Sequence, residues 1–225
     1  SPPPPSNPVA LHLASRDKAD NLVYLSRPCQ FIKMPQDKGC TEKYWLEDRY
    51  APEVIDAYEI ALNDIAARYD ISGFHLIGYD GGGNIAAILA ARRPDVLTLR
   101  TVAGNLNPDF ATEQKPSRIL SGKSIRAIDY GTSLAGIPQH HFIGAVDREV
   151  TPGVYHSYRQ AVGLSDCIHY SMVPDADHER GWVEKWPALL ALEPQCAKVY
   201  TDLPPLPVME PISPYKGPVE PKYSK

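Results

Sequence analysis

Short apolar runs alternate with amphipathic stretches along the middle of the chain, and this alternation predicts a sheet covered by helices. Strands are expected in the apolar runs 21–25, 74–78, 97–103, 141–145 and 168–173. Helices are expected over 8–14, 84–93 and 182–192, and in the segments that begin at Pro52 and Pro152. Continuous apolar strands joined through helices are typical of a parallel sheet buried on both faces. The predicted fold class is therefore α/β, with a mainly parallel sheet of at least five strands and helices on both faces.

Proline is concentrated at the two ends of the chain. Twelve of the 23 prolines lie within residues 1–8 and 203–225. Because proline fixes φ and lacks a backbone donor, neither end is expected to form a helix or an interior strand. We therefore divide the chain into a proline-rich segment 1–8, a single domain 9–198 and a proline-rich tail 199–225. Such ends act as linkers or polyproline II arms, and we expect them to contact protein partners if they are ordered.

Composition narrows the classes of partner. A chain of 225 residues with 43% hydrophobic and 22% charged residues is typical of one globular domain. Its net charge of −4 and isoelectric point near 6.0 predict no general attraction to nucleic acid or to anionic membranes. No apolar run approaches the roughly 20 residues that span a bilayer, so no transmembrane segment is expected. The chain does not begin with a basic and then apolar segment, and we expect any targeting peptide to have been removed.

Four cysteines predict an oxidising compartment. Cys29 and Cys40 flank a loop, whereas Cys167 begins the last expected strand and Cys196 follows the last expected helix. Four cysteines allow three pairings, and the spacing alone does not choose among them. Because each of these two pairs flanks a connection that the fold can close, we predict the bridges Cys29–Cys40 and Cys167–Cys196. Disulfides indicate a periplasmic or extracellular location, and the absence of CxxC-like spacing argues against a zinc site.

The sequence GYDGGG at 78–83 lies directly between an expected strand and an expected helix. Glycines on both sides of Asp80 allow the sharp strand-to-helix turn that lifts a nucleophile above a sheet edge. The following helix directs its free N–H groups at the same residue. Glycine-rich turns of this kind also bind phosphates, but the Rossmann spacing and the P-loop lysine are absent here.

Two later residues make the motif more specific. Asp147 follows the fourth expected strand, and His178 lies in the loop after the fifth. The α/β-hydrolase triad has the same chain order: first the nucleophile, then the acid and then the histidine, each after a strand. We interpret the remaining histidines as structural, because they lie on expected helices or strands: His12, His75, His140, His141, His156 and His169.

These segments resemble the α/β-hydrolase family over about residues 8–195. The resemblance is carried by FHLIGYDGGGNIAAILAARRPDVLTLRTVAGNL, QHHFIGAVDREVTP and PDADHERGWVEKWP. The chain is similar in particular to exported bacterial hydrolases, often lipoproteins, whose elbow reads Gly-Tyr-Ser-Gly-Gly-Gly. The resemblance implies that position 80 is the nucleophile, Asp147 the acid, His178 the base, and the N–H of Gly81 half of an oxyanion hole. It also implies a small ester substrate, no cofactor or metal, and attachment to a membrane only through a partner or a lipidated N-terminus.

Aspartate at position 80 leaves three hypotheses open. The first is an ester hydrolase that is weakly active or inactive because aspartate replaces serine. The second is a catalytically silent subunit of an extracytoplasmic assembly, held through residues 1–8 and 203–225. The third is a dehalogenase or epoxide hydrolase with an aspartate nucleophile. Those enzymes carry a cap domain between nucleophile and acid, and the 67 positions from Asp80 to Asp147 leave no room for a large cap.

The second oxyanion donor of the family comes from a loop after an earlier strand. The chain begins about where that loop has passed. We expect the donor to be supplied by a missing N-terminal segment or by another chain, or the hole to be half built. Loss of one such donor typically lowers turnover by about 10²–10³.

Overall fold

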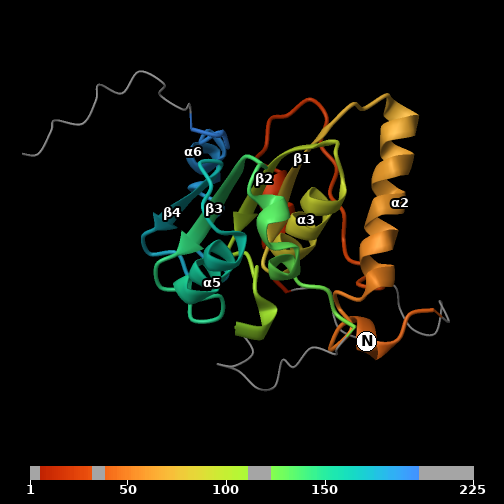
Figure 1. Ribbon diagram of the computed structural model, residues 1–225, viewed down its shortest axis with the longest axis horizontal. Coiled ribbons are helices and arrows are strands. Elements are labelled where there is room, and N and C mark those ends of the chain that lie inside the picture. The colour runs from red at the N-terminus through yellow and green to blue at the C-terminus, as the bar shows by residue number, and fades with distance from the viewer. Residues whose placement is uncertain (1–5, 32–38, 111–122, 198–225) are drawn as a thin grey trace, which may run out of the picture.

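Four parallel strands form the centre of the domain. The computed structural model describes residues 6–31, 39–110 and 123–197, so the tail 199–225 and most of the segment 1–8 lie outside the described residues. In the sheet the strands follow one another in chain order: β1 (Phe74–Tyr79), β2 (Val96–Val102), β3 (Gln139–Gly144) and β4 (Ile168–Val173). Every neighbouring pair is parallel (Figure 1). The carboxyl ends of all four strands therefore meet at one edge, and the predicted α/β class is confirmed.

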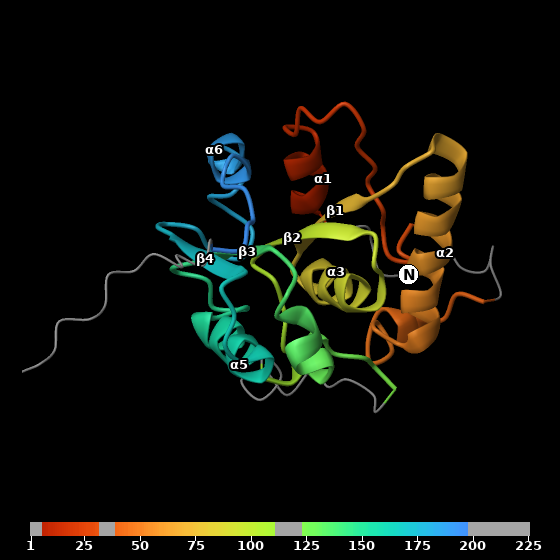
Figure 2. The same ribbon diagram turned by 45° about the horizontal axis from the view of Figure 1, so that its top comes forward.

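Helices cover both faces of this sheet (Figure 2). One face carries α1 (Val9–Ala14) and α6 (Trp186–Leu190). The other carries α3 (Gly81–Arg92), α5 (Pro152–Val162) and the 3₁₀ segment η3 (Ala127–Leu134). The long helix α2 (Pro52–Tyr69) packs outside α3, and the short 3₁₀ turn η1 (Glu42–Tyr44) precedes it. Both α2 and α5 begin with a proline in the first turn, as the sequence predicted, because no hydrogen-bonded N–H is required there.

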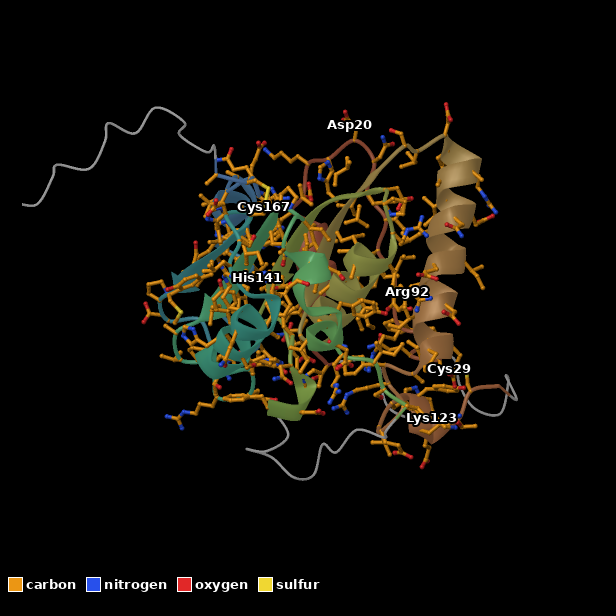
Figure 3. The ribbon with its side chains drawn as sticks, in the orientation of Figure 1. Asp20, Cys29, Arg92, Lys123, His141 and Cys167 are labelled. Carbon is orange, nitrogen blue, oxygen red and sulfur yellow. A yellow bond between two sulfur atoms is a disulfide. The ribbon has the colours of Figure 1, made fainter. Side chains whose placement is uncertain are left out.

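Successive side chains along a strand point to opposite faces of the sheet, and this divides the core between the two faces. Leu99 and Ile143 pack with α3, η3 and α5, whereas Val102 and Phe142 pack with α1 and the tryptophans near α6. A third cluster joins α2 to α3. Arg92 on α3 reinforces this contact through ion pairs with Asp56 and Glu59 of α2 (Figure 3). Strand β3 and the carboxyl-terminal half of β2 are thus buried on both sides, as the continuous apolar strands indicated. The edge strands β1 and β4 instead leave alternate side chains exposed, among them Ile77, Tyr170 and Met172.

Two predicted elements are wrong. The run 21–25 is not a strand, because its residues enter no ladder and leave Leu22 and Val23 43% and 56% exposed. The described residues therefore form four strands rather than five. The last helix begins at Trp186 instead of residue 182. Pro187 cannot donate an i→i−4 hydrogen bond and is tolerated only in a first turn, so the helix starts beside it.

Both predicted disulfides are present. Cys29 is bonded to Cys40 ahead of α2, and Cys167–Cys196 joins the start of β4 to the segment after α6. Figure 3 shows Cys29 and Cys167 at distant parts of the domain, so the two bridges fasten separate connections. Within the described ranges, no helix is both long and apolar enough to cross a membrane.

Candidate active site

Asp80 occupies a sharp turn between β1 and α3. Its backbone has φ 48° and ψ −122°, in the left-handed region that residues with a side chain rarely adopt. The turn depends on Gly78, because a Cβ atom there would overlap the carbonyl group of Gly82. The Asp80 side chain is 39% exposed. This is the backbone geometry of a nucleophile elbow, with the side chain presented above the sheet edge.

The elbow is tied to the end of β2 by two backbone hydrogen bonds. The amide of Asp80 donates to the carbonyl of Val102 over 3.1 Å, and the amide of Asn105 donates to the carbonyl of Asp80 over 2.9 Å. Gly83 also packs closely on Gly104. The strained residue is therefore held from both sides by the neighbouring strand and its loop, which is how such a conformation persists.

Asp147 follows β3 and its side chain is completely buried. Its Oδ1 atom accepts hydrogen bonds from the amides of Glu149 and Val150, at 2.7 and 2.9 Å. Its Oδ2 atom lies 3.0 Å from Nδ1 of His178. A carboxylate satisfied in this way fixes the orientation of the imidazole, so that Nδ1 carries the proton toward Asp147 and Nε2 faces position 80.

The loop that carries His178 is held by two aromatic residues that the sequence did not single out. The hydroxyl of Tyr79 donates to the His178 carbonyl over 2.9 Å. The indole of Trp182 donates to the carbonyls of Asp177 and His178, at 2.8 and 3.2 Å. Since Tyr79 directly precedes Asp80, its hydroxyl links the elbow to the histidine loop. No short-range pattern in the sequence indicates these contacts.

Asp80 and Asp147 lie on opposite sides of the His178 ring. The Nε2 atom is 3.7 Å from Oδ1 of Asp80, which allows an ion pair when the ring is protonated but not a hydrogen bond. Burial acts to lower the pKa of His178, but the hydrogen bond to Asp147 and the charges of Asp80 and Asp147 act to raise it, and the net shift is upward. The site therefore favours the charged imidazolium, which is not the protonation state of a general base.

The structure thus brings together the three side chains that the sequence selected. Gly81 begins α3, so its N–H lies at the start of the helix beside Asp80. The histidines interpreted as structural include His141, which is buried and bonds through its ring nitrogens to Thr101 and Gln139. Among the described residues, no group of three or more His, Cys, Asp and Glu side chains is arranged to hold a metal ion.

A cavity of 280 Å³ lies between the segment 25–31 and α2. Its lining includes Arg27 and Tyr58, but of the three candidate triad residues none contributes to it. This cavity is therefore not an apolar pocket closed over Asp80, the arrangement that an aspartate-nucleophile dehalogenase would need.

Comparisons with known proteins agree on the fold. No family model matches the sequence, and no curated protein matches it. Among solved structures, the Pyrococcus furiosus esterase Pf2001 is similar with a TM-score of 0.52 and 15% identity, over 62% of this chain and 60% of that one. VinJ is similar with a TM-score of 0.51 and 12% identity, over 65% of this chain and 73% of that one. At these identities the likeness shows the α/β-hydrolase fold alone.

Proposed function

We propose that the chain is an ester-hydrolase-like protein in which Asp80 stands where a serine would act, and that it does not turn over esters as it stands. The observation that carries this proposal is the arrangement of Asp80, His178 and Asp147 at one sheet edge, with Nε2 of His178 directed at position 80. An α/β-hydrolase fold similar to esterases supports it.

The replaced nucleophile removes the first step of acyl transfer. A serine hydroxyl gives its proton to Nε2 while its oxygen attacks the ester carbonyl. An ionised aspartate only accepts hydrogen bonds, so Asp80 has no proton to give to His178. Attack by its carboxylate would form an anhydride in place of an acyl ester. Its charge would also repel the oxyanion that develops beside it.

The test is a p-nitrophenyl acetate assay on three proteins: the unmodified chain, His178→Ala and Asp80→Ser. We expect the unmodified chain to show no hydrolysis above that of His178→Ala. Hydrolysis by the unmodified chain that disappears in His178→Ala would overturn the proposal and make Asp80 a working nucleophile.

A second assay addresses the aspartate-nucleophile alternative directly. The unmodified chain is incubated with 1-bromobutane or styrene oxide in ¹⁸O-labelled water. Mass spectrometry then measures the mass of the peptide that contains Asp80. An aspartate nucleophile forms an alkyl ester that water hydrolyses, so repeated turnover would place ¹⁸O in the Asp80 carboxylate. We expect no incorporation and no product.

The two disulfides support a location for this protein. Disulfides persist in the periplasm and outside the cell, and they are rare in the reducing cytosol. We therefore propose an extracytoplasmic, oxidising compartment for the chain, which agrees with a resemblance to exported hydrolases.

A further inference from the structure

The hydroxyl of Tyr50 lies against the Cα atom of Gly81. Tyr50 precedes α2 and is only 2% exposed. A Cβ atom at position 81 would overlap the Tyr50 hydroxyl oxygen and touch two ring carbons. The phenol group therefore reaches the residue whose backbone N–H follows Asp80, from a segment 31 positions earlier in the chain.

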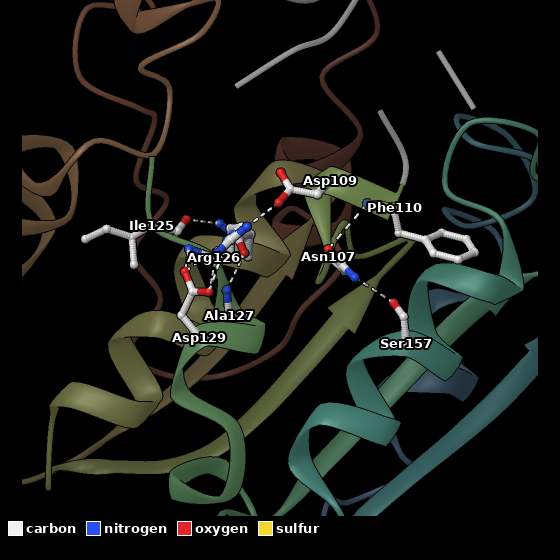
Figure 4. Close-up of polar contacts among 9 residues, drawn as sticks. Asn107, Asp109, Phe110, Ile125, Arg126, Ala127, Asp129 and Ser157 are labelled. Carbon is white, nitrogen blue, oxygen red and sulfur yellow. Dashed lines mark hydrogen bonds and ion pairs between the residues drawn. The ribbon is translucent and has the colours of Figure 1, made fainter. Parts of the chain in front are cut away.

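Hydrogen bonds connect the backbone of Tyr50 to α3, the helix that follows the elbow. Asn84 on α3 is completely buried, and its side chain accepts from the Ala127 amide and donates to the Ile125 carbonyl, at 2.8 and 3.1 Å. The amide of Ile125 in turn donates to the carbonyl of Tyr50 over 2.8 Å. Figure 4 shows the Ile125–Ala127 segment, where Arg126 also pairs with Asp109 and Asp129. A chain of hydrogen bonds thus fixes the position of Tyr50 relative to α3.

The surroundings keep the Tyr50 hydroxyl protonated. Burial and then the charge of Asp80 raise the pKa of Tyr50, although the positive charges of Arg49 and Arg27, and a side-chain hydrogen bond from Arg49, act in the opposite direction. At neutral pH the group is therefore a neutral donor. The same two arginines make the electrostatic potential at this hydroxyl more positive, and a positive potential favours a negatively charged oxygen beside it.

We propose that Tyr50 supplies the second hydrogen-bond donor of the oxyanion site, together with the backbone N–H of Gly81. This inference rests on the proposed function, because it takes position 80 as the place of a nucleophile. It replaces the expectation that the donor comes from a missing segment or another chain. In the unmodified chain the Asp80 carboxylate is close enough for its charge to raise the pKa of Tyr50. We therefore expect a working oxyanion site once a hydroxyl replaces that carboxylate.

The step that this site would assist can be written for the variant Asp80→Ser and a p-nitrophenyl ester. The introduced hydroxyl oxygen forms a bond to the ester carbon, its proton moves to Nε2 of His178, and the carbonyl π electrons become the oxyanion. Tyr50 and Gly81 donate hydrogen bonds to that oxyanion. The intermediate then expels p-nitrophenolate, which takes up the proton from His178, and water hydrolyses the acyl ester that remains.

The experiment compares Asp80→Ser with two double variants that also carry Tyr50→Phe or Tyr58→Phe. Tyr58 is the matched control. It lies on α2 and packs against the same hydrophobic cluster as Tyr50, but it is not among the atoms nearest to the glycines of the elbow. We expect Asp80→Ser to hydrolyse p-nitrophenyl acetate. Adding Tyr50→Phe should lower kcat by about 10²–10³ with little change in KM, since the lost donor acts in the transition state. Adding Tyr58→Phe should change neither constant.

A covalent trap gives a second readout. Diethyl p-nitrophenyl phosphate should phosphorylate the hydroxyl introduced by Asp80→Ser, with release of p-nitrophenolate, and mass spectrometry follows the adduct. We expect Tyr50→Phe to slow adduct formation by a factor comparable with its effect on kcat. Circular dichroism and thermal unfolding check that each variant is folded.

The outcomes separate this inference from the proposed function. If folded Asp80→Ser neither hydrolyses the ester nor forms the adduct, Tyr50 and Gly81 do not make an oxyanion site and the inference fails. The inference is also overturned if Asp80→Ser and the double variant Asp80→Ser/Tyr50→Phe hydrolyse the ester at equal rates. Neither result touches the proposed function, which fails only if the unmodified chain hydrolyses esters in a His178-dependent way.

Discussion

The Nε2 atom of His178 faces the carboxylate of Asp80 at 3.7 Å, while the Nδ1 atom of the same ring lies 3.0 Å from Asp147. The imidazole is thus placed between two acidic side chains, one exposed in part and one fully buried. In a serine hydrolase the first of these positions holds a hydroxyl that can give up a proton. Here it holds a second negative charge, and the electrostatics of the whole site change accordingly.

We predict that Asp80→Asn lowers the pKa of His178. The change removes the charge that faces Nε2 but keeps the size of the side chain and leaves the hydrogen bond to Asp147 in place. The measurement is the pH titration of the His178 ring proton by NMR, assigned with His178→Gln. Asp177→Asn, which removes a neighbouring charge on the exposed side of the loop, is the control and should have the smaller effect. An unchanged titration in Asp80→Asn would show that the two groups do not interact.

We predict that two histidines on β3, the half-buried His140 and the buried His141, make the protein sensitive to acid. Burial, followed by the charges of neighbouring cationic groups, lowers the pKa of His140 to about 4 and that of His141 to about 3. The unfolded chain, with histidine near pKa 6.5, binds these protons first as the pH falls. The free energy of unfolding should therefore decrease from about pH 6.5 downward, through the pKa values of the folded state.

Urea unfolding between pH 7.5 and pH 4.5 measures this effect. The variant His141→Gln should be less stable at pH 7.5, because its hydrogen bonds to Thr101 and Gln139 are disturbed, but its stability should depend less on pH. His156→Gln, at an exposed position on α5, should follow the unmodified chain. If His141→Gln and the unmodified chain lose stability in parallel, the buried imidazole is not the source.

We predict that alanine destabilises the fold at one glycine of the elbow and not at another. A Cβ atom at Gly78 would overlap the backbone of Gly82, whereas a Cβ atom at Gly82 meets nothing within 4 Å. Gly78→Ala should therefore lower the free energy of unfolding by about 1–3 kcal/mol, as overpacking does. Gly82→Ala, in the first turn of α3, should leave it unchanged or raise it by about 0.5–1 kcal/mol. Chemical denaturation of both variants checks the pair, and equal losses would contradict the elbow geometry.

Much of the site was predictable because its three side chains follow strands in a parallel sheet. The carboxyl ends of such strands share one edge, so Asp80, Asp147 and His178 converge once the strands are placed. The position of Tyr50 was not predictable in this way. Its contact with Gly81 depends on how the segment before α2 folds over α3, through side-chain hydrogen bonds that leave no periodic pattern in the sequence.

The wrong elements have a similar explanation. The run 21–25 has the composition of a strand, but a strand also needs a neighbour with free backbone groups, and composition does not show one. Trp182 carries an apolar side chain at a helical spacing from Trp186, yet its indole donates to the histidine loop. The segment before α6 is therefore fixed by hydrogen bonds to the loop that carries His178 and not by helix formation.

Finally, we predict that the two disulfides stabilise the fold to different extents. Cys167 and Cys196 are 29 positions apart in the chain, and Cys29 and Cys40 are 11 positions apart. Loop-closure entropy gives stabilisations of about 3.6 and about 2.8 kcal/mol, so the double variant Cys167→Ala/Cys196→Ala should unfold at lower urea than Cys29→Ala/Cys40→Ala. Alkylation before and after reduction provides the check on bonding. The unmodified chain should take up no label when denatured without reductant and four labels after reduction. Four labels without reductant would mean that the thiols are free, and the proposed oxidising compartment would then be wrong.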